Sequence, residues 1–168
     1  MNKRTFLKTS SVLLTGTMLN HLISCKKAEA RTNWAGNLTY STDNLHTPKT
    51  VAELQEAIKS CKKVRALGTK HCFNTIADST ENQISTAEFN KIISLDKEKN
   101  TVTVEAGIKY GEVCKYLDDN GYALPNLASL PHISVAGACA TSTHGSGIKN
   151  GSLATAVSAM EMVKRLST

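Results

Sequence analysis

Two stretches rich in small residues hold the side chains most able to do chemistry in this chain of 168 residues. They are GTKHCFN (68–74) and SVAGACATSTHGSG (134–147). Small residues let a backbone approach a ligand closely, and N–H groups exposed in such turns bind anions. Hydroxyls that could add hydrogen-bond donors are those of Thr69, Ser134, Thr141 and Thr143. Taken alone, these residues favour equally a cradle for a phosphate-bearing ligand and two tight turns packed against each other.

The histidines within or next to these stretches, His71, His132 and His144, show no metal-binding pattern. None is at ligand spacing from another His, Asp or Glu, and the five cysteines include no C-x-x-C pair, so we expect no metal. His71 and Cys72 are adjacent, and neighbouring side chains point apart in an extended chain. No local pattern pairs His71 with a thiol nucleophile. A histidine that only forms hydrogen bonds within the scaffold is the alternative.

The elements around the first stretch are a helix and a strand. Thr50 and Glu53 form the capping box that begins a helix, and its apolar face is predicted to consist of Leu54, Ala57, Ile58 and Cys61. A strand is predicted over 64–67, and Gly68 ends it. The histidine at position 71 is therefore expected in a turn at the end of a strand.

The rest of the chain predicts further short elements of both kinds. They are strands over 92–95 and 102–104, a helix over 110–117 with Gly121 as its C-cap, and a strand over 154–163. An antiparallel strand pair among short helices favours an α+β fold over a doubly wound sheet. The dinucleotide-binding pattern G-x-G-x-x-G is absent after the first predicted strand.

The first 25 residues predict an export signal rather than part of the fold. A basic start, MNKRTFLKTS, precedes the short apolar run SVLLTGTML and the segment LISC, which ends at Cys25. This order is typical of a bacterial lipoprotein signal, in which Cys25 becomes the lipidated first residue; Lys3-Arg4 also resembles a relaxed twin-arginine signal. We expect an exported, periplasmic or cell-envelope protein that meets the membrane only through a lipid on Cys25. An ordinary signal peptide with a chance cysteine is the alternative. Residues 26–40 are predicted to be a tether and the start of the domain.

Composition excludes one class of partner. The formal net charge is +6, but many of the positive residues lie near the start, and elsewhere Lys and Arg mix with Asp and Glu. No basic stripe carries interleaved aromatic residues, so we expect no nucleic-acid binding. A hydrophobic fraction of 40% is ordinary for a globular domain and can supply a core.

Four motifs in the same order give the chain a specific resemblance. TNWAGN (32–37), LGTKHCFN (67–74), LPNLASLPHISVAGACATSTHGSG (124–147) and NGSLA (150–154) together resemble the alditol oxidases and aldonolactone oxidases. These are flavoproteins of the vanillyl-alcohol-oxidase type. The resemblance implies a two-subdomain α+β fold of the PCMH type that binds FAD, over residues 41–168 and incomplete at the C-terminus. It also implies that the family's substrate domain is absent from this chain.

The resemblance implies a role for each matching residue. His71 corresponds to the histidine that the family joins covalently to the 8α-methyl group of the flavin. Residues implied to contact FAD are Ala66, Leu67, Gly68, Thr69, Lys70, His71, Cys72, Ser129, Ser134, Gly137, Ala138, Cys139, Ala140, Thr141, His144 and Gly145. Ser129 also lies where the family places a serine near the substrate hydroxyls. Lys70 replaces a family glycine, so a long positive side chain enters a tight loop.

The chemistry implied is oxidation of a CH–OH group of an alditol or sugar lactone. A hydride would pass from the carbinol carbon to flavin N5, and the flavin would then reduce oxygen or another acceptor. No residue can be assigned as the general base from the sequence. The alternatives are a truncated flavin-binding fragment without turnover, a reductase of cell-wall precursors with a related FAD domain, and an exported lipoprotein whose two loops are only turns.

Overall fold

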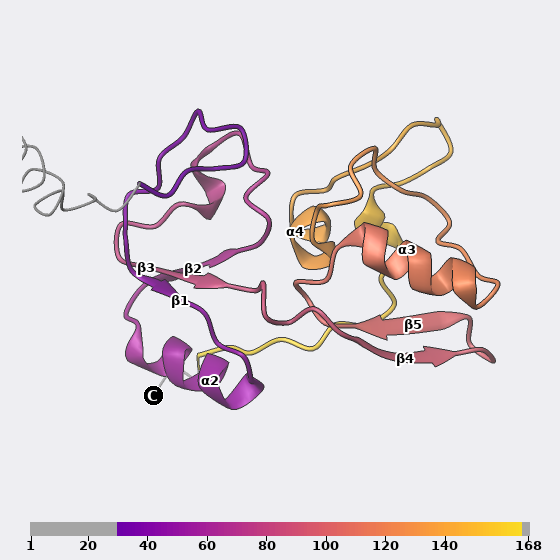
Figure 1. Ribbon diagram of the computed structural model, residues 1–168, viewed down its shortest axis with the longest axis horizontal. Helices are drawn as coiled ribbons and strands as arrows, with labels where there is room; N and C mark the ends of the chain where they lie inside the picture. The colour runs from indigo at the N-terminus through magenta and orange to yellow at the C-terminus, as the bar shows by residue number, and fades with distance from the viewer. Residues whose placement is uncertain (1–29, 166–168) are drawn as a thin grey trace, which may run out of the picture. The chain divides into compact units, whose positions relative to one another are not determined.

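A computed structural model describes residues 30–165 of the chain (Figure 1). The predicted signal segment, its Cys25 and the first residues of the tether lie outside the described residues. Packed structure is present from Arg31, whose guanidinium donates to the backbone oxygen of Thr42 at 2.6 Å and to Oε1 of Gln83 at 2.7 Å. No helix of the described part is long and apolar enough to cross a membrane.

A three-stranded parallel sheet carries the first stretch. Its order is β1 (Leu45–His46), β3 (Asn82–Ser85), β2 (Val64–Leu67), and β3 pairs in parallel with both neighbours. The predicted strand over 64–67 is confirmed as β2. Helix α2 (Val51–Ser60) connects β1 to β2 and lies beside the sheet in Figure 1. The chain turns away from this sheet at Gly68, directly after β2.

The start of α2 follows from its capping residues. The Glu53 N–H donates to Oγ1 of Thr50 at 3.2 Å, and the Lys49 N–H donates to the Glu53 carboxylate at 2.7 Å. The first bond satisfies an N–H group that a helix start leaves without a partner, and it confirms Thr50 as the N-cap. The predicted capping box is only half formed, because Glu53 binds the N–H of Lys49, one residue before the cap, and not that of Thr50. The apolar face is only partly covered, since Leu54, Ala57 and Ile58 are half-buried while Cys61 is buried.

An antiparallel pair and a helix form a second packed group. Strand β4 (Ile92–Asp96) pairs with β5 (Thr101–Val104), which confirms the predicted hairpin. Helix α3 (Tyr110–Asp119) packs on this pair through Val113 and Leu117, which are buried together with Ile108. Gly121 adopts φ +79° just beyond the helix end, as expected for a C-cap glycine. With both sheets and helices present, the predicted α+β class is confirmed.

Two predictions for the last third of the chain are wrong. Residues 135–140, expected within a small-residue loop, form the helix α4 (Val135–Ala140), because alanine favours helix and the small buried Ala138 packs against Tyr110, Ile133 and Leu153. The strand expected over 154–163 is replaced by the 3₁₀ turn η2 (Leu153–Ala156) and irregular chain. Within residues 30–165 no strand pairs with this segment, so its backbone groups have no ladder to join.

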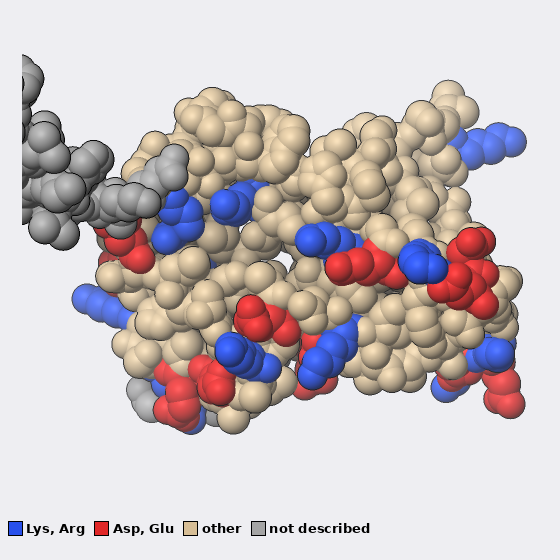
Figure 2. Space-filling view, viewed as in Figure 1, with Lys and Arg blue, Asp and Glu red and all other residues tan. Residues whose placement is uncertain are grey.

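Opposite charges lie close together on the surface (Figure 2). The ion pairs are local: Lys59 with Glu56 at 2.7 Å, Lys99 with Asp96 at 3.2 Å, and Lys115 with Asp119 at 3.0 Å. All these side chains are solvent-exposed, so each pair contributes little to stability. Burial of the apolar clusters therefore contributes more to the stability of the fold than the surface ion pairs do.

We expect the Ile108→Ala substitution to lower the free energy of unfolding by about 2–5 kcal/mol, because it leaves a cavity in the core under α3. Ile108 is 2% exposed, whereas Ile93 is 63% exposed. The matched Ile93→Ala substitution should change the free energy by less than about 0.5 kcal/mol. Urea unfolding followed by circular dichroism measures both values. Equal losses in the two variants would contradict this description of the core.

Candidate functional site

The loop that follows β2 is held in place by a segment from the start of the domain. The Trp34 N–H donates to the Lys70 carbonyl at 2.8 Å, and Nδ2 of Asn33 donates to the Cys72 carbonyl at 3.0 Å. Lys70 has φ +65°, a left-handed conformation that favours glycine. The loop therefore bends sharply at an exposed lysine, and its two sides are tied to the segment 33–34.

The first stretch meets the second at Ser134. Oγ1 of Thr69 accepts a hydrogen bond from the Ser134 N–H at 3.1 Å. A Cβ atom added at Gly68 would lie 2.6 Å from Oγ of Ser134, and one added at Gly137 would lie 2.8 Å from the same oxygen. The serine hydroxyl occupies the space between the two glycines, and a side chain at either would force this hydroxyl to move. The structure brings together the two stretches that sequence reasoning selected.

The hydroxyl of Ser134 has no hydrogen-bond partner among the described residues, although the residue is only 1% exposed. A buried polar group without a partner costs about 1–3 kcal/mol. Beside it a cleft of about 120 Å³ is lined by Thr69 and Ser134 and, at the start of α3, by Lys109 and Glu112. This cleft is small beside a dinucleotide, so it can accept one polar group of a ligand and not the whole.

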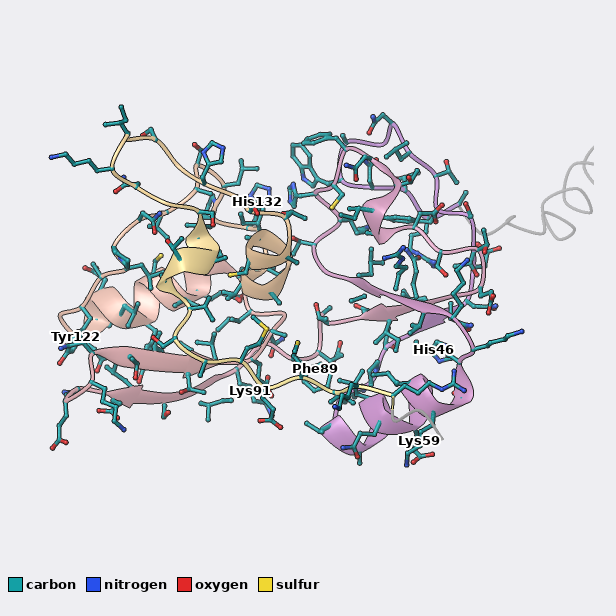
Figure 3. All side chains as sticks on the ribbon, turned by 180° about the vertical axis from the view of Figure 1, so that it is seen from behind. His46, Lys59, Phe89, Lys91, Tyr122 and His132 are labelled. Atoms are coloured by element: carbon teal, nitrogen blue, oxygen red, sulfur yellow. The ribbon has the colours of Figure 1, made fainter. Side chains whose placement is uncertain are left out.

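Three rings form a cluster next to the loop, and one of them, that of His132, is labelled in Figure 3. The His71 ring centroid lies 4.8 Å from that of Trp34 and 4.7 Å from that of His132, and the Trp34 and His132 centroids are 5.8 Å apart. Nδ1 of His71 and Nε2 of His132 are buried and have no partner among the described residues. Burial, and then the charge of His132, lower the pKa of His71. His71 therefore presents a neutral imidazole with a free nitrogen.

The first two backbone N–H groups of α4 already donate hydrogen bonds within the protein. The Val135 N–H donates to the Ile108 carbonyl at 2.9 Å, and the Ala136 N–H donates to the Ala106 carbonyl at 3.0 Å. Ser134, at the N-cap, makes no side-chain capping bond. These two amides hold α4 against the segment before α3, so they are not free for a ligand.

Two predicted residues of α4 direct their side chains into the core. Ala138 is 4% exposed and lies in the apolar cluster under η2. Sγ of Cys139 lies 3.7 Å from the Tyr110 hydroxyl, and burial raises the pKa of that tyrosine. Any contact of Ala138 with a ligand would have to come from its backbone.

The remaining predicted residues lie at the surface or support the turn after α4. Thr141 donates to the Gly137 carbonyl at 3.1 Å. His144 is exposed, and Nδ1 of its ring lies 3.0 Å from the Gly145 carbonyl. Gly145 packs directly on the Leu127 carbonyl, where an added Cβ would approach to 2.1 Å. Ala66, Ala140 and Ser129 are exposed, Leu67 is buried and Cys72 is half-buried.

Sequence reasoning omitted Asn33, Trp34 and His132 from the site. Trp34 is the chain's single tryptophan and lies in the motif TNWAGN, which was the available signal. His132 lies in the motif at 124–147, which was the corresponding signal, but only the fold shows that its ring contacts that of His71. Within residues 30–165, no three His, Cys, Asp or Glu side chains gather as metal ligands, and the four described cysteines are free thiols.

The unpaired hydroxyl predicts unequal effects for two buried serines. Ser134→Ala should leave the free energy of unfolding of the flavin-free protein unchanged or raise it by up to about 1 kcal/mol, because it removes an unsatisfied group. Ser79 is 4% exposed, and its hydroxyl accepts from the N–H groups of Glu81 and Asn82, each at 3.2 Å. Ser79→Ala should therefore cost about 1–3 kcal/mol. Chemical denaturation compares the two; a similar loss for Ser134→Ala would argue against an unpaired hydroxyl.

The lowered pKa of His71 predicts a pH-dependent stability. Between its folded pKa and its usual value of about 6.5, the unfolded chain binds more protons than the folded chain. The free energy of unfolding should therefore fall as the pH is lowered from about 7.5 to about 5, and His71→Gln should reduce this fall. Denaturation of flavin-free protein across this range is the measurement. His144→Gln, which alters an exposed histidine, should keep the wild-type dependence; a His71→Gln dependence identical to wild type would contradict the assignment.

Comparison with known proteins agrees with this geometry. The sequence pattern described as FAD binding domain matches residues 43–167. The chain is 42% identical to an alditol oxidase from a Streptomyces species over 80% of this chain and 33% of the relative. It is 36% identical to L-gulonolactone oxidase from Mus musculus over 79% of this chain and 31% of the relative. The chain thus spans about a third of the curated relatives it matches.

A solved structure shares the fold. The crystal structure of a cholesterol oxidase from B. sterolicum aligns with a TM-score of 0.60 at 19% identity, over 69% of this chain and 24% of that one. At this identity the likeness concerns the fold alone, and it agrees with the predicted PCMH-type architecture. By the matched pattern and the relatives above 30% identity, the chain belongs to the family of PCMH-type FAD-binding domains.

Proposed function

We propose that FAD binds where the loop 68–72 meets Ser134, and that His71 holds it covalently. The observation that carries the proposal is the pair of buried atoms without partners, Oγ of Ser134 and Nδ1 of His71, on the two motifs characteristic of the family. An FAD diphosphate and a flavin methyl group would give these atoms the partners they lack. The residues present therefore fit the cofactor that the family binds.

The diphosphate would lie along the first loop. Backbone N–H groups of residues 66–72 and the Ser134 hydroxyl supply donors, and exposed Lys70 supplies a positive charge. Gly68 and Gly137 let the two segments approach closely enough for both to reach one ligand. Further proposed contacts are Ser129, Ala138, Cys139, Ala140, Thr141, His144 and Gly145.

The state of the His71 imidazole supports covalent attachment at this residue. A nitrogen can attack carbon only through a free lone pair, and the lowered pKa keeps this ring neutral near pH 7. Trp34 and His132 restrict how the ring turns. A nitrogen bonded to the flavin methyl carbon withdraws electrons, which would raise the reduction potential of the flavin and favour substrate oxidation.

The reaction proposed is oxidation of a CH–OH group of an alditol or an aldonolactone, with oxygen or another acceptor taking the electrons. Bound FAD supplies the hydride-accepting centre. The relatives named alditol oxidase and L-gulonolactone oxidase support this substrate class. Exposed Ser129 is the residue we propose for contact with a substrate hydroxyl. We also propose export through residues 1–25, with a lipid on Cys25.

The attachment is tested by acid precipitation of the purified protein. Wild-type protein should precipitate yellow, because the flavin stays bound, whereas His71→Ala should give a colourless pellet and release FAD. Trp34, the single tryptophan, should be strongly quenched in the flavin-loaded protein because its ring lies 4.8 Å from that of His71. Colourless, folded wild-type protein with unquenched Trp34 after incubation with FAD would refute the proposed function. If the protein retains flavin but oxidises neither xylitol nor a lactone, flavin binding is supported and the proposed oxidation is contradicted.

A further inference from the structure

The histidine that faces His71 is itself held firmly. His132 lies between Pro131, whose carbonyl accepts the Gly111 N–H at 2.7 Å, and Ile133, whose carbonyl accepts the Tyr110 N–H at 3.1 Å. Ile133 is 6% exposed and anchors the segment in the core. The backbone on both sides of His132 is therefore fixed to the start of α3, which leaves little freedom for the ring to move away.

The two imidazoles are in contact and both are incompletely paired. Their centroids are 4.7 Å apart with an interplanar angle of 51°, so the ring edges meet without stacking flat. Nδ1 of His71 and Nε2 of His132 are the unpaired nitrogens. No Asp or Glu among residues 30–165 forms a hydrogen bond to either ring. Nδ1 is the nitrogen proposed to bond the flavin, so the proton that must leave is the one on Nε2 of His71. His132, whose ring contacts that of His71, is the basic group that can take this proton, directly or through one water.

Covalent attachment releases a proton that such a group can accept. It breaks one C–H bond of the flavin methyl group and one N–H bond of the His71 imidazole, and it forms one N–C bond. Two electrons remain on the flavin and pass to dioxygen, which takes up the two protons to give hydrogen peroxide. The imidazole proton must leave His71 for the product to be neutral, and the ring cluster offers His71 no other acceptor among the described residues.

We infer that His132 is a positioning residue that accepts the proton of His71 and thereby speeds attachment of the flavin. This inference rests on the proposed function. His132 acts on His71 and not on the substrate, so its loss should slow attachment while leaving the affinity for dissociable FAD unchanged. General-base assistance of this kind contributes about 10²–10⁴-fold to a rate, and the lower end is expected for a proton that solvent can also take.

The test follows attachment directly. Flavin-free full chain is mixed with FAD, and the flavin fluorescence that stays with acid-precipitated, denatured protein is recorded over time. His132→Phe keeps an aromatic ring beside Trp34 but has no nitrogen; His132→Gln keeps hydrogen bonding but has no basic nitrogen. Both should attach FAD about 10²-fold more slowly than wild type, with free imidazole restoring part of the rate. Quenching of Trp34 by FAD before attachment checks that each variant still folds and binds.

The outcomes separate this inference from the function it rests on. His46→Gln is the matched control, since His46 lies at Asn82 and Cys61, away from the ring cluster, and it should attach FAD at the wild-type rate. Attachment at the wild-type rate in His132→Gln or His132→Phe would overturn the role of His132 and leave the proposed function intact. Wild-type protein that quenches Trp34 with FAD but never attaches it, or that binds no FAD, would overturn both.

Discussion

The hydrogen bond from the Ser134 N–H to Thr69 joins segments 65 residues apart, and the site depends on it. Thr69 belongs to the loop after the parallel sheet, whereas Ser134 begins a short helix packed on α3. Neither segment builds the site alone. The serine hydroxyl fills the space between Gly68 and Gly137, so a side chain at either glycine would displace this hydroxyl from its present position. Because packing within each group sets this distance, a core substitution far from the loop can open the site.

The buried polar atoms at this contact lower the stability of the fold as long as no ligand pairs them. Ser134, His71 and His132 each bury an atom that forms no hydrogen bond among residues 30–165. Buried polar groups are normally paired, and the exceptions commonly mark functional positions. A ligand that pairs them recovers the desolvation cost and stabilises only the folded state. Ligand affinity and fold stability are therefore coupled at these three residues.

Patterns within a few residues predicted the elements that form locally. The elements and site residues that were not predicted depend on contacts between distant parts of the chain. The capping residues of α2, the alternation in β4 and β5, and the glycine after α3 act within a few residues, so sequence reasoning found them. Strands β1 and β3 escaped because they are short and partly polar; buried Gln83 is accommodated only through Arg31 and the Ala77 carbonyl. The sequence of α4 has no pattern of large apolar residues at helical spacing, so it did not indicate a helix. The motifs include both stretches that meet at Ser134, and they also contain Trp34 and His132, but the contact of these two rings with His71 is a tertiary one that spacing along the chain does not reveal.

Lys70 lowers the conformational entropy of the first loop relative to a loop with glycine at this position. Glycine would adopt φ +65° freely, but it would also give the unfolded chain, and any open form of the loop, many more conformations to lose. Lysine costs about 1–2 kcal/mol in this conformation and recovers about 0.4–1 kcal/mol by restricting those alternatives. The gain offsets only part of the cost, so lysine remains net destabilising at this position by about 1 kcal/mol. The loop is consequently more rigid than its glycine counterpart at a small cost in stability, and an anion that binds there has less chain left to immobilise.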